Sequence, residues 1–210
     1  MKEATVYAIR TDTVRELDLD ALETVMPERM AKARRFYFER DRLLCLGAGF
    51  LMMEALGIRD EKEIRYGENG KPYAPGFPPF SISHSGQWCI LAIGSGDAEI
   101  GADLEEIDER HTDIAAKVCT PGELAWMRED PLERFFQLWT WKESVMKATG
   151  RGIALEPGSF EVLPFTKAQA VRIEGRDWYA SGGRWDNCRF SVCADEPIGH
   201  VVFRTLSGHR

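Results

Sequence analysis

The chain has 210 residues, of which 44% are hydrophobic and 29% are charged, enough apolar material for a sizeable core in one large domain or two small halves. Its net charge of −7 argues against a dedicated nucleic-acid binder. Five cysteines without C-x-x-C spacing indicate a reducing compartment, and because we find neither a signal peptide nor a run of about 20 apolar residues, we expect a soluble cytoplasmic protein.

The first third of the chain is predicted to be mostly helical. A short strand is expected at residues 5–9 and a short helix at 14–25. A long helical stretch follows at 27–56, broken near Gly47 and Gly49 and ended by Gly57. Its first half is rich in Arg and Lys, which are either a solvated helix face or an anion site; these residues are Arg29, Lys32, Arg34, Arg35, Arg40 and Arg42.

A hairpin is predicted in the middle of the chain. After a short strand at 64–66, Asn69 and Gly70 indicate a tight turn. Residues 80–83 and 88–93 are expected to pair, with His84 at the bend. A single histidine in a turn is usually without special function. Here it lies between two serines, whose hydroxyls are small hydrogen-bond donors suited to a phosphate.

Residues 99–107 predict a strand that carries two carboxylates. Because side chains alternate along a strand, Gly101, Asp103 and Glu105 share one face. Two carboxylates on one face repel each other unless a cation lies between them. Oxygen ligands without nearby His or Cys favour Mg²⁺ over zinc. The alternative is an ordinary strand face turned to water, since D-x-E is a weak signal.

The most unusual segment is the predicted helix at residues 132–152, which is apolar nearly all round. At about 100° per residue, Phe136, Trp139, Glu143 and Lys147 share one face. The charged pair is either a surface i,i+4 pair or part of a site, because buried charges are costly unless paired. A helix start with a capping box is predicted at Thr120. Short strands that form an antiparallel C-terminal sheet are expected at 160–163, 170–173, 178–180, 189–194 and 200–204.

Four segments in this order resemble the 4′-phosphopantetheinyl transferases of the long, monomeric, surfactin-synthetase-activating type. They are Gly70-Lys71-Pro72, FSISHS at 80–85, IGADLE at 100–105, and WKES at 141–144 with Lys147 and Gly150. The resemblance implies an α+β fold of two similar halves in a pseudo-twofold arrangement, with the active site between them. Residues 1–100 would contact coenzyme A, and residues 101–210 would carry the metal site, the catalytic helix and the carrier contacts.

The resemblance also implies an activity. The 4′-phosphopantetheine arm of coenzyme A would move to a serine of an apo acyl or peptidyl carrier protein, and adenosine 3′,5′-bisphosphate would be released. The reaction would depend on Mg²⁺, with Mn²⁺ as the alternative metal. The protein would be a monomer that binds neither nucleic acid nor a membrane. Whether the carrier serves fatty-acid, polyketide or nonribosomal peptide synthesis is left open.

The same resemblance assigns roles to individual residues. Asp103, Glu105 and Glu143 would bind the metal, and Asp103, Glu143 and Lys147 would be catalytic. Either Glu143 or a water on the metal would take the proton of the carrier serine. The residues expected to bind coenzyme A are Arg29, Lys32 and Arg35 at the 3′-phosphate, Gly70, Lys71 and Pro72 at the adenine, and Ser83, His84, Lys142 and Lys147 at the phosphates.

Two other functions use many of the same residues. A Mg²⁺-dependent phosphohydrolase would use the carboxylates with water, but it would not need Lys71, His84 or the basic helix. A non-catalytic module that binds coenzyme A or a carrier would not need a metal-held base. Residues 112–127 are a candidate surface for carrier docking, with ordinary core and helix faces as the equally favoured alternative.

Overall fold

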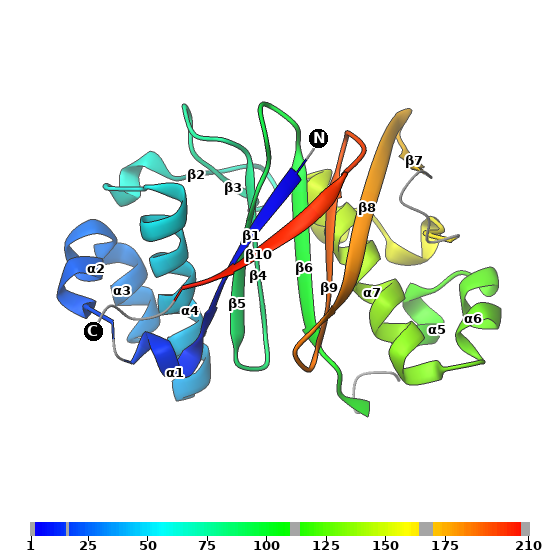
Figure 1. Cartoon of the computed structure of the whole chain (residues 1–210), viewed down its shortest axis with the longest axis horizontal. Coiled ribbons are helices and arrows are strands. Elements are labelled where there is room, and N and C mark those ends of the chain that lie inside the picture. The colour runs from blue at the N-terminus through cyan, green and yellow to red at the C-terminus, as the bar shows by residue number, and fades with distance from the viewer. Residues whose placement is uncertain (1–2, 16, 110–113, 164–169, 207–210) are drawn as a thin grey trace.

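The computed structural model describes residues 3–15, 17–109, 114–163 and 170–206. It shows the expected α+β fold, in which two four-stranded sheets lie side by side at the centre and helices lie on the outer sides (Figure 1). A long helix packs on each sheet, α4 (Glu39–Leu51) on the first and α7 (Pro131–Ala148) on the second. The pseudo-twofold relation between the halves stays a prediction. Among the described segments, no helix is long and apolar enough to cross a membrane.

The first sheet has the strand order β10-β1-β5-β4. Strand β1 (Glu3–Arg10) and the hairpin of β4 (Phe80–Ser85) and β5 (Trp88–Ile93) confirm the predicted strands. His84 lies within β4, paired with Cys89, rather than at the bend. The turn itself follows Ser85, where Gly86 has a positive φ of 57°. A small separate ribbon, β2 (Arg65–Tyr66) with β3 (Pro72–Tyr73), follows the short helix at Glu61–Glu63.

Strand β10 (His200–Thr205) lies in this first sheet, parallel to β1. The prediction that it joins the C-terminal antiparallel sheet is therefore wrong. The reason is packing: Phe203 is stacked on Trp185 at 4.9 Å between ring centroids and meets Phe190 edge-on at 4.6 Å. These contacts place β10 across the boundary between the sheets, as Figure 1 shows. The last strand of the chain thus belongs to the sheet built by residues 1–100.

The second sheet is antiparallel throughout, in the order β6-β9-β8-β7. Its strands are β6 (Ile100–Glu106), β7 (Val171–Ile173), β8 (Arg176–Trp185) and β9 (Cys188–Ala194), and they confirm three of the predicted C-terminal strands. Residues 160–163 do not form the predicted strand. Instead, the backbone N–H of Val162 donates to Glu123 Oε1 at 2.8 Å. A side chain thus replaces the strand partner that this N–H would need.

The N-terminal helices differ from the prediction in where they break. Instead of one helix, residues 14–25 contain the last residue of α1 (Thr11–Val14) and all of α2 (Leu19–Val25). The long helical stretch breaks at residues 34–38, between α3 (Pro27–Ala33) and α4, and Gly57 ends the π-helical turn Met52–Leu56 with φ 87°. Gly47 and Gly49 lie inside α4. A Cβ at Gly49 would lie 2.8 Å from Arg29 Cδ, so this glycine permits close packing instead of breaking the helix.

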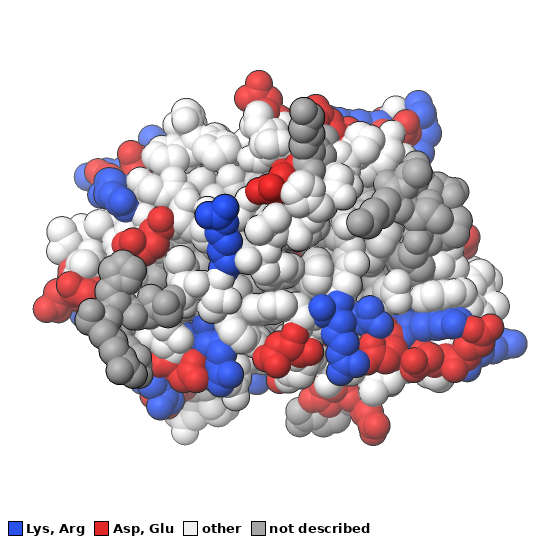
Figure 2. Space-filling view, viewed as in Figure 1, with Lys and Arg blue, Asp and Glu red and all other residues white. Residues whose placement is uncertain are grey.

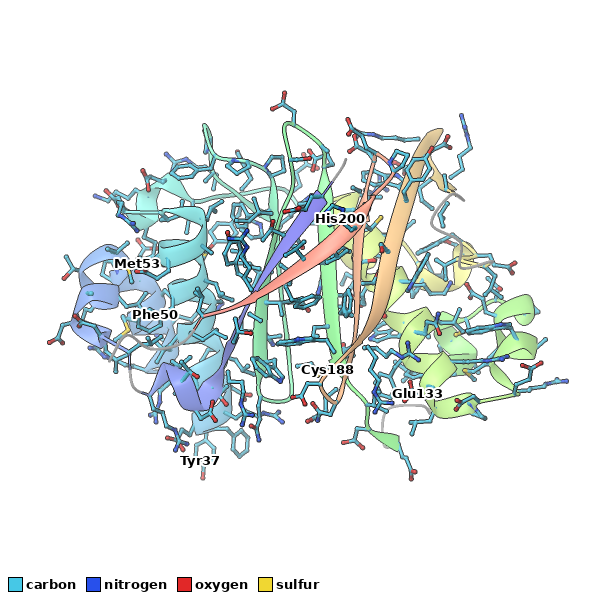
Figure 3. All side chains as sticks on the ribbon, viewed as in Figure 1. Tyr37, Phe50, Met53, Glu133, Cys188 and His200 are labelled. Carbon is cyan, nitrogen blue, oxygen red and sulfur yellow. The ribbon has the colours of Figure 1, made fainter. Side chains whose placement is uncertain are left out.

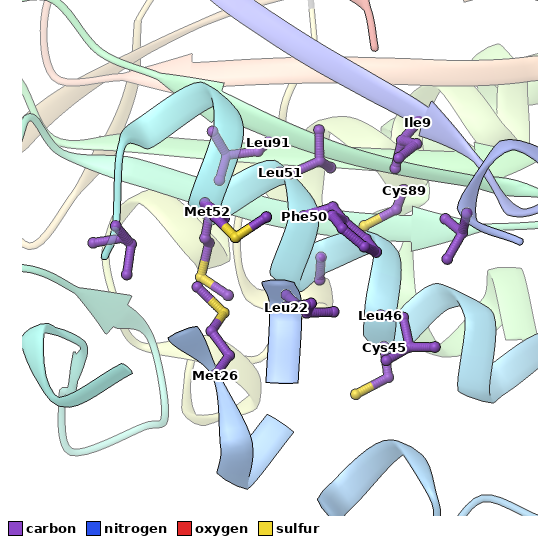
Figure 4. Packing of buried hydrophobic residues seen from close by; sticks show 14 of the residues in the cluster. Ile9, Leu22, Met26, Cys45, Leu46, Phe50, Leu51, Met52, Cys89 and Leu91 are labelled. Carbon is purple, nitrogen blue, oxygen red and sulfur yellow. The ribbon is translucent and has the colours of Figure 1, made fainter. Parts of the chain in front are cut away.

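The inner face of α4 and the π-helical turn builds the N-terminal core against the first sheet (Figure 4). Phe50 is 2% exposed and lies near Ile9, Cys89 and Leu91, which come from β1 and β5. Met26 and Met52 close the other side of this cluster. At about 25 cal/mol per Å² of apolar area, such burial is the main force that holds α4 on the sheet.

Helix α7 lies directly on strand β6. A Cβ at Gly101 would lie 2.1 Å from the backbone oxygen of Ser144 and 2.2 Å from the backbone nitrogen of Ala148, so only glycine permits this approach. The helix begins after the cap Asp130 and ends at Ala148, before Gly150 with φ 68°. The other elements of this half are α5 (Ala115–Val118), α6 (Pro121–Met127) with the predicted capping box at Thr120, and 3₁₀ turns at Gly152–Ala154 and Pro157–Ser159.

Candidate active site

A cavity of about 530 Å³ opens where the two sheets and their helices meet. Helices α3 and α4 and strand β4 line one side, and β6 and α7 line the other. Most of the residues predicted for the site lie together in its wall: Arg29, Lys32, Pro72, Ser83, His84, Asp103, Glu105, Glu143 and Lys147. Segments that are far apart in sequence therefore form one polar cavity.

An ion pair lies at the centre of this wall. Lys147 Nζ is 2.6 Å from Asp103 Oδ1, and it also donates to Ser83 Oγ at 2.9 Å. Ser83 in turn donates to Asp103 Oδ1 at 2.8 Å. Burial lowers the pKa of Lys147, but the carboxylates of Asp103, Glu143 and Glu105 outweigh this and raise it above its ordinary value. The ammonium is therefore charged at neutral pH.

The other two carboxylates resist ionisation. Burial, and then the negative charge of Asp103, raise the pKa of Glu105 to about 7. The same two causes raise the pKa of Glu143. Asp103 Oδ2 is buried and accepts no hydrogen bond from the described residues. Three crowded carboxylates and one unpartnered oxygen fit an oxygen-preferring divalent cation such as Mg²⁺ or Mn²⁺.

The carboxylates are arranged around Lys147 rather than as an assembled metal site. Within the described ranges, no three carboxylate, imidazole or thiol side chains form a group that could hold a metal ion. The support for the predicted ligands Asp103, Glu105 and Glu143 comes from the chemistry of their oxygen donors and not from their present geometry. Their roles as metal ligands stay a prediction.

His84 lies in the wall beside this centre. Burial lowers its pKa, and the positive charge of Lys147 lowers it further. The imidazole is therefore neutral at pH 7, when one ring nitrogen donates and the other accepts a hydrogen bond. In that state it suits hydrogen bonding to a phosphate oxygen rather than ion pairing.

Two of the three basic residues predicted for the 3′-phosphate reach the cavity. Arg29 and Lys32 of α3 line it, whereas Arg35 in the connection to α4 does not. Arg29 Nη1 donates to the backbone oxygen of Cys45 at 3.3 Å, which orients the guanidinium. Arg29 and Lys32 form the basic end of the cavity, and the carboxylates form the acidic end.

Lys71 does not line the cavity and instead bonds to neighbouring segments. Its Nζ donates to Glu99 Oε2 at 2.9 Å and to the backbone oxygen of Ala148 at 3.0 Å, which fastens the Gly-Lys-Pro loop to the end of α7. Gly70 lies in the preceding turn with φ 79°, where glycine is favoured. Of the three residues predicted for the adenine, only Pro72 lines the cavity.

Lys142 does not reach the cavity, which corrects its prediction as a phosphate ligand. The side chain is fully buried and pairs with Glu123 Oε2 at 2.9 Å. Its Nζ also donates to the backbone oxygens of Pro157 at 2.8 Å and Phe160 at 2.6 Å. One residue along a helix is a rotation of about 100°, so Lys142 points away from the face that carries Glu143.

Two side chains that bond to Glu105 were not predicted, and together with Glu105 they line a neighbouring cavity. Ser85 Oγ donates to Glu105 Oε2 at 2.8 Å, and Trp139 Nε1 donates to Glu105 Oε1 at 3.3 Å. Trp139 shares a helix face with Glu143, and Ser85 shares a strand face with Ser83, so periodicity is the signal that leads to both.

The stretch predicted to dock a carrier mostly packs inward. Its residues 112–113 lie outside the described part of the chain. Val118 is buried, and Leu124, Trp126 and Met127 pack against the C-terminal core. The alternative, ordinary core and helix faces, therefore accounts for these apolar side chains.

Exposed aromatic side chains lie instead between α3 and α4. Tyr37 is 92% exposed and Phe38 is 65% exposed, and Phe36 beside them reaches the cavity wall. Figure 3 shows Tyr37 pointing away from the ribbon at the lower edge of the molecule. On the face drawn in Figure 2, basic and acidic residues lie side by side along the lower edge, and the centre is mostly uncharged.

Sequence comparison shows which known proteins this chain is similar to. Residues 99–193 match the 4′-phosphopantetheinyl transferase superfamily. The chain is 34% identical to a 4′-phosphopantetheinyl transferase of Bacillus subtilis over 77% of this chain and 76% of that protein. It is 36% identical to the 4′-phosphopantetheinyl transferase psf-1 of Bacillus pumilus, over 69% and 66% respectively. The 4′-phosphopantetheinyl transferase AcpT of Escherichia coli is 41% identical over 42% of this chain and 49% of that protein.

Proposed function

Because the chain belongs to the 4′-phosphopantetheinyl transferases, we propose that it transfers the 4′-phosphopantetheine group of coenzyme A to a serine of an acyl or peptidyl carrier protein. The other product is adenosine 3′,5′-bisphosphate. The observation that supports this best is the Lys147–Asp103 pair at the junction of the two halves. It lies in the same cavity as the basic residues Arg29 and Lys32.

The cavity suits a ligand with phosphates at two places. Its volume of about 530 Å³ lies within the range of small-molecule and cofactor sites. We propose that Arg29 and Lys32 bind the 3′-phosphate, since guanidinium and ammonium groups are the usual phosphate donors. Neutral His84 and the ammonium of Lys147 would then donate to the pyrophosphate.

The transfer needs positioning, charge neutralisation and the movement of one proton. The carrier hydroxyl attacks the phosphorus that bears pantetheine, and the bond from this phosphorus to the bridging oxygen breaks. Lys147 stabilises the negative charge that develops on that oxygen. Glu143, which lines the same cavity as Lys147, takes the hydroxyl proton.

A divalent cation would supply further charge neutralisation at the pyrophosphate. Asp103, Glu105 and Glu143 would hold it, because burial and the negative charge of Asp103 raise the pKa of Glu105 and Glu143, and a cation would offset that negative charge. This set also leaves the unpartnered Asp103 Oδ2 available as a ligand.

The test is to incubate the protein with coenzyme A, MgCl₂ and a panel of apo carrier domains and to weigh each carrier by mass spectrometry. We expect one carrier or more to gain a single phosphopantetheine group, and EDTA to prevent it. Asp103→Asn and Glu143→Gln, which keep the side-chain shape, should abolish transfer and leave the circular dichroism unchanged.

Four results would contradict the proposal, in whole or in part. Carriers that stay unmodified across the panel would exclude the transfer itself. Inorganic phosphate released from coenzyme A without any carrier would favour the phosphohydrolase. Coenzyme A binding without any product would favour the non-catalytic module. Full activity in EDTA, or in Asp103→Asn, would exclude the metal assignment alone, and full activity in Glu143→Gln would also exclude Glu143 as the base.

A further inference from the structure

The two sheets are joined by a row of serine hydroxyls. Strands β4 and β6 are edge strands of their sheets and lie side by side. Every second residue of β4 in this region is a serine whose hydroxyl accepts a backbone N–H of β6. These bonds run from Ala102 N to Ser81 Oγ at 2.9 Å, from Leu104 N to Ser83 Oγ at 3.4 Å, and from Glu106 N to Ser85 Oγ at 3.0 Å. We call Ser81, Ser83 and Ser85 the serine ladder.

The last serine of the ladder has a second partner in the candidate active site. A hydroxyl has a single proton to donate. The Glu106 N–H is itself a donor, so the proton of Ser85 goes to Glu105 Oε2, at 2.8 Å. Trp139 Nε1 donates to the other oxygen, Glu105 Oε1, at 3.3 Å. The two oxygens of Glu105 are thus held from two sides, by strand β4 and by helix α7.

Glu105 needs such support because of its neighbours. The negative charge of Asp103, on the same face of β6, repels it. A glutamate side chain also has several rotatable bonds, and ordering it costs conformational entropy. Without donors on both oxygens, the carboxylate would turn away from Asp103 and leave the cavity wall.

We propose that Ser85 is a positioning residue that holds the Glu105 carboxylate toward the cavity, where it serves as a ligand of the divalent cation. Trp139 is its counterpart on α7. This inference rests on the proposed function, because it assumes that Glu105 binds the cation. Groups that orient a metal ligand typically contribute 10–100-fold to metal affinity or activity.

The ladder offers a matched control for the experiment. Ser81 is buried, and its Oγ accepts the backbone N–H of Ala102 in the same way, at 2.9 Å, but it has no carboxylate partner among the described residues. Ser81→Ala and Ser85→Ala therefore remove the same kind of strand contact, and only Ser85→Ala releases Glu105. Ser85→Thr restores the hydroxyl.

The measurement is Mn²⁺ binding to the complex of the full chain with coenzyme A, followed by electron paramagnetic resonance, together with kcat and KM for a carrier. We expect Ser85→Ala to weaken Mn²⁺ binding about 10- to 100-fold and to lower kcat with little change in KM for the carrier. Ser85→Thr should recover most of both. Ser81→Ala should lower the thermal midpoint but leave Mn²⁺ affinity within about twofold of the wild type.

Unchanged Mn²⁺ affinity in Ser85→Ala would overturn the inference. Equal weakening in Ser81→Ala would also overturn it, because the effect would then belong to the joint between the sheets. If Ser85→Ala does not fold, Trp139→Phe removes only the other donor and keeps the ring, and unchanged Mn²⁺ affinity in it would overturn the inference as well. A wild-type complex that binds no Mn²⁺ would instead refute the metal assignment on which the inference rests.

Discussion

Lys147 Nζ lies 2.6 Å from Asp103 Oδ1, and Ser83 Oγ contacts both groups. The three side chains come from α7, β6 and β4, so this small network joins helix α7 to both sheets. It needs the close approach of α7 to β6 that Gly101 permits. The close packing at Gly101 thus determines where the Lys147 ammonium lies in the site.

Removal of the Lys147 ammonium should lower turnover more than coenzyme A affinity. We expect Lys147→Met to lower kcat by about 10²–10³-fold, the usual loss when one donor to a developing charge is removed. The dissociation constant of coenzyme A should change far less. Single-turnover kinetics and calorimetric titration measure the two quantities. A loss confined to affinity would instead give Lys147 a binding role.

The buried Lys142–Glu123 pair should matter for stability and not for substrate binding. Both side chains are fully buried, and breaking such a pair from one side costs about 3–5 kcal/mol. We expect Lys142→Met to lower the free energy of unfolding in urea by this order. The double variant Lys142→Met/Glu123→Leu, which leaves no lone buried charge, should recover part of it. A weakened coenzyme A affinity in folded Lys142→Met would restore the phosphate role predicted from sequence.

The basic end of the cavity should distinguish coenzyme A from its 3′-dephospho form. Lys32→Ala should weaken coenzyme A, most strongly at low salt, because exposed charges are screened by ions. The affinity for 3′-dephospho-coenzyme A should stay the same. Arg35→Ala is the control, since Arg35 lies three residues away but does not line the cavity. If both variants lose equal affinity for both ligands, the 3′-phosphate lies elsewhere.

The stability of the metal-free protein should depend on pH through Glu105. Its pKa in the folded protein is about 7, above its ordinary value of 4.5. The folded state therefore takes up a proton before the unfolded state does, and the protein gains stability from this group as pH falls from about 7 toward 4.5.

Glu105→Gln has no proton to gain at this position. The stability of the wild type relative to Glu105→Gln should therefore rise as pH is lowered through this window. Denaturation in urea with EDTA, at pH values between 5 and 8, measures the difference. A difference that stays constant with pH would show that Glu105 is ionised normally in the fold.

Local patterns predicted much of the secondary structure. The capping box at Thr120, the hairpin of β4 and β5 and the strand at β6 follow from residue type and period, which depend on near neighbours in sequence. Local patterns did not predict where the helical stretch breaks. Gly47 and Gly49 predict weakness in an isolated helix, but in the fold they face Ile9 and Arg29 at close range. Tertiary packing outweighs the helix propensity of these glycines.

By itself, the sequence determined the order of motifs that identifies the family. It also predicted which residues would carry the chemistry, namely the carboxylates of β6 and the Glu143 and Lys147 face of α7. Only the tertiary structure decided which of them meet. It buried Lys142 against Glu123, left Arg35 outside the cavity, and brought Ser85 to Glu105. The physical reason is that a periodic pattern specifies the face on which a side chain lies, whereas contacts between residues distant in sequence depend on how whole faces pack.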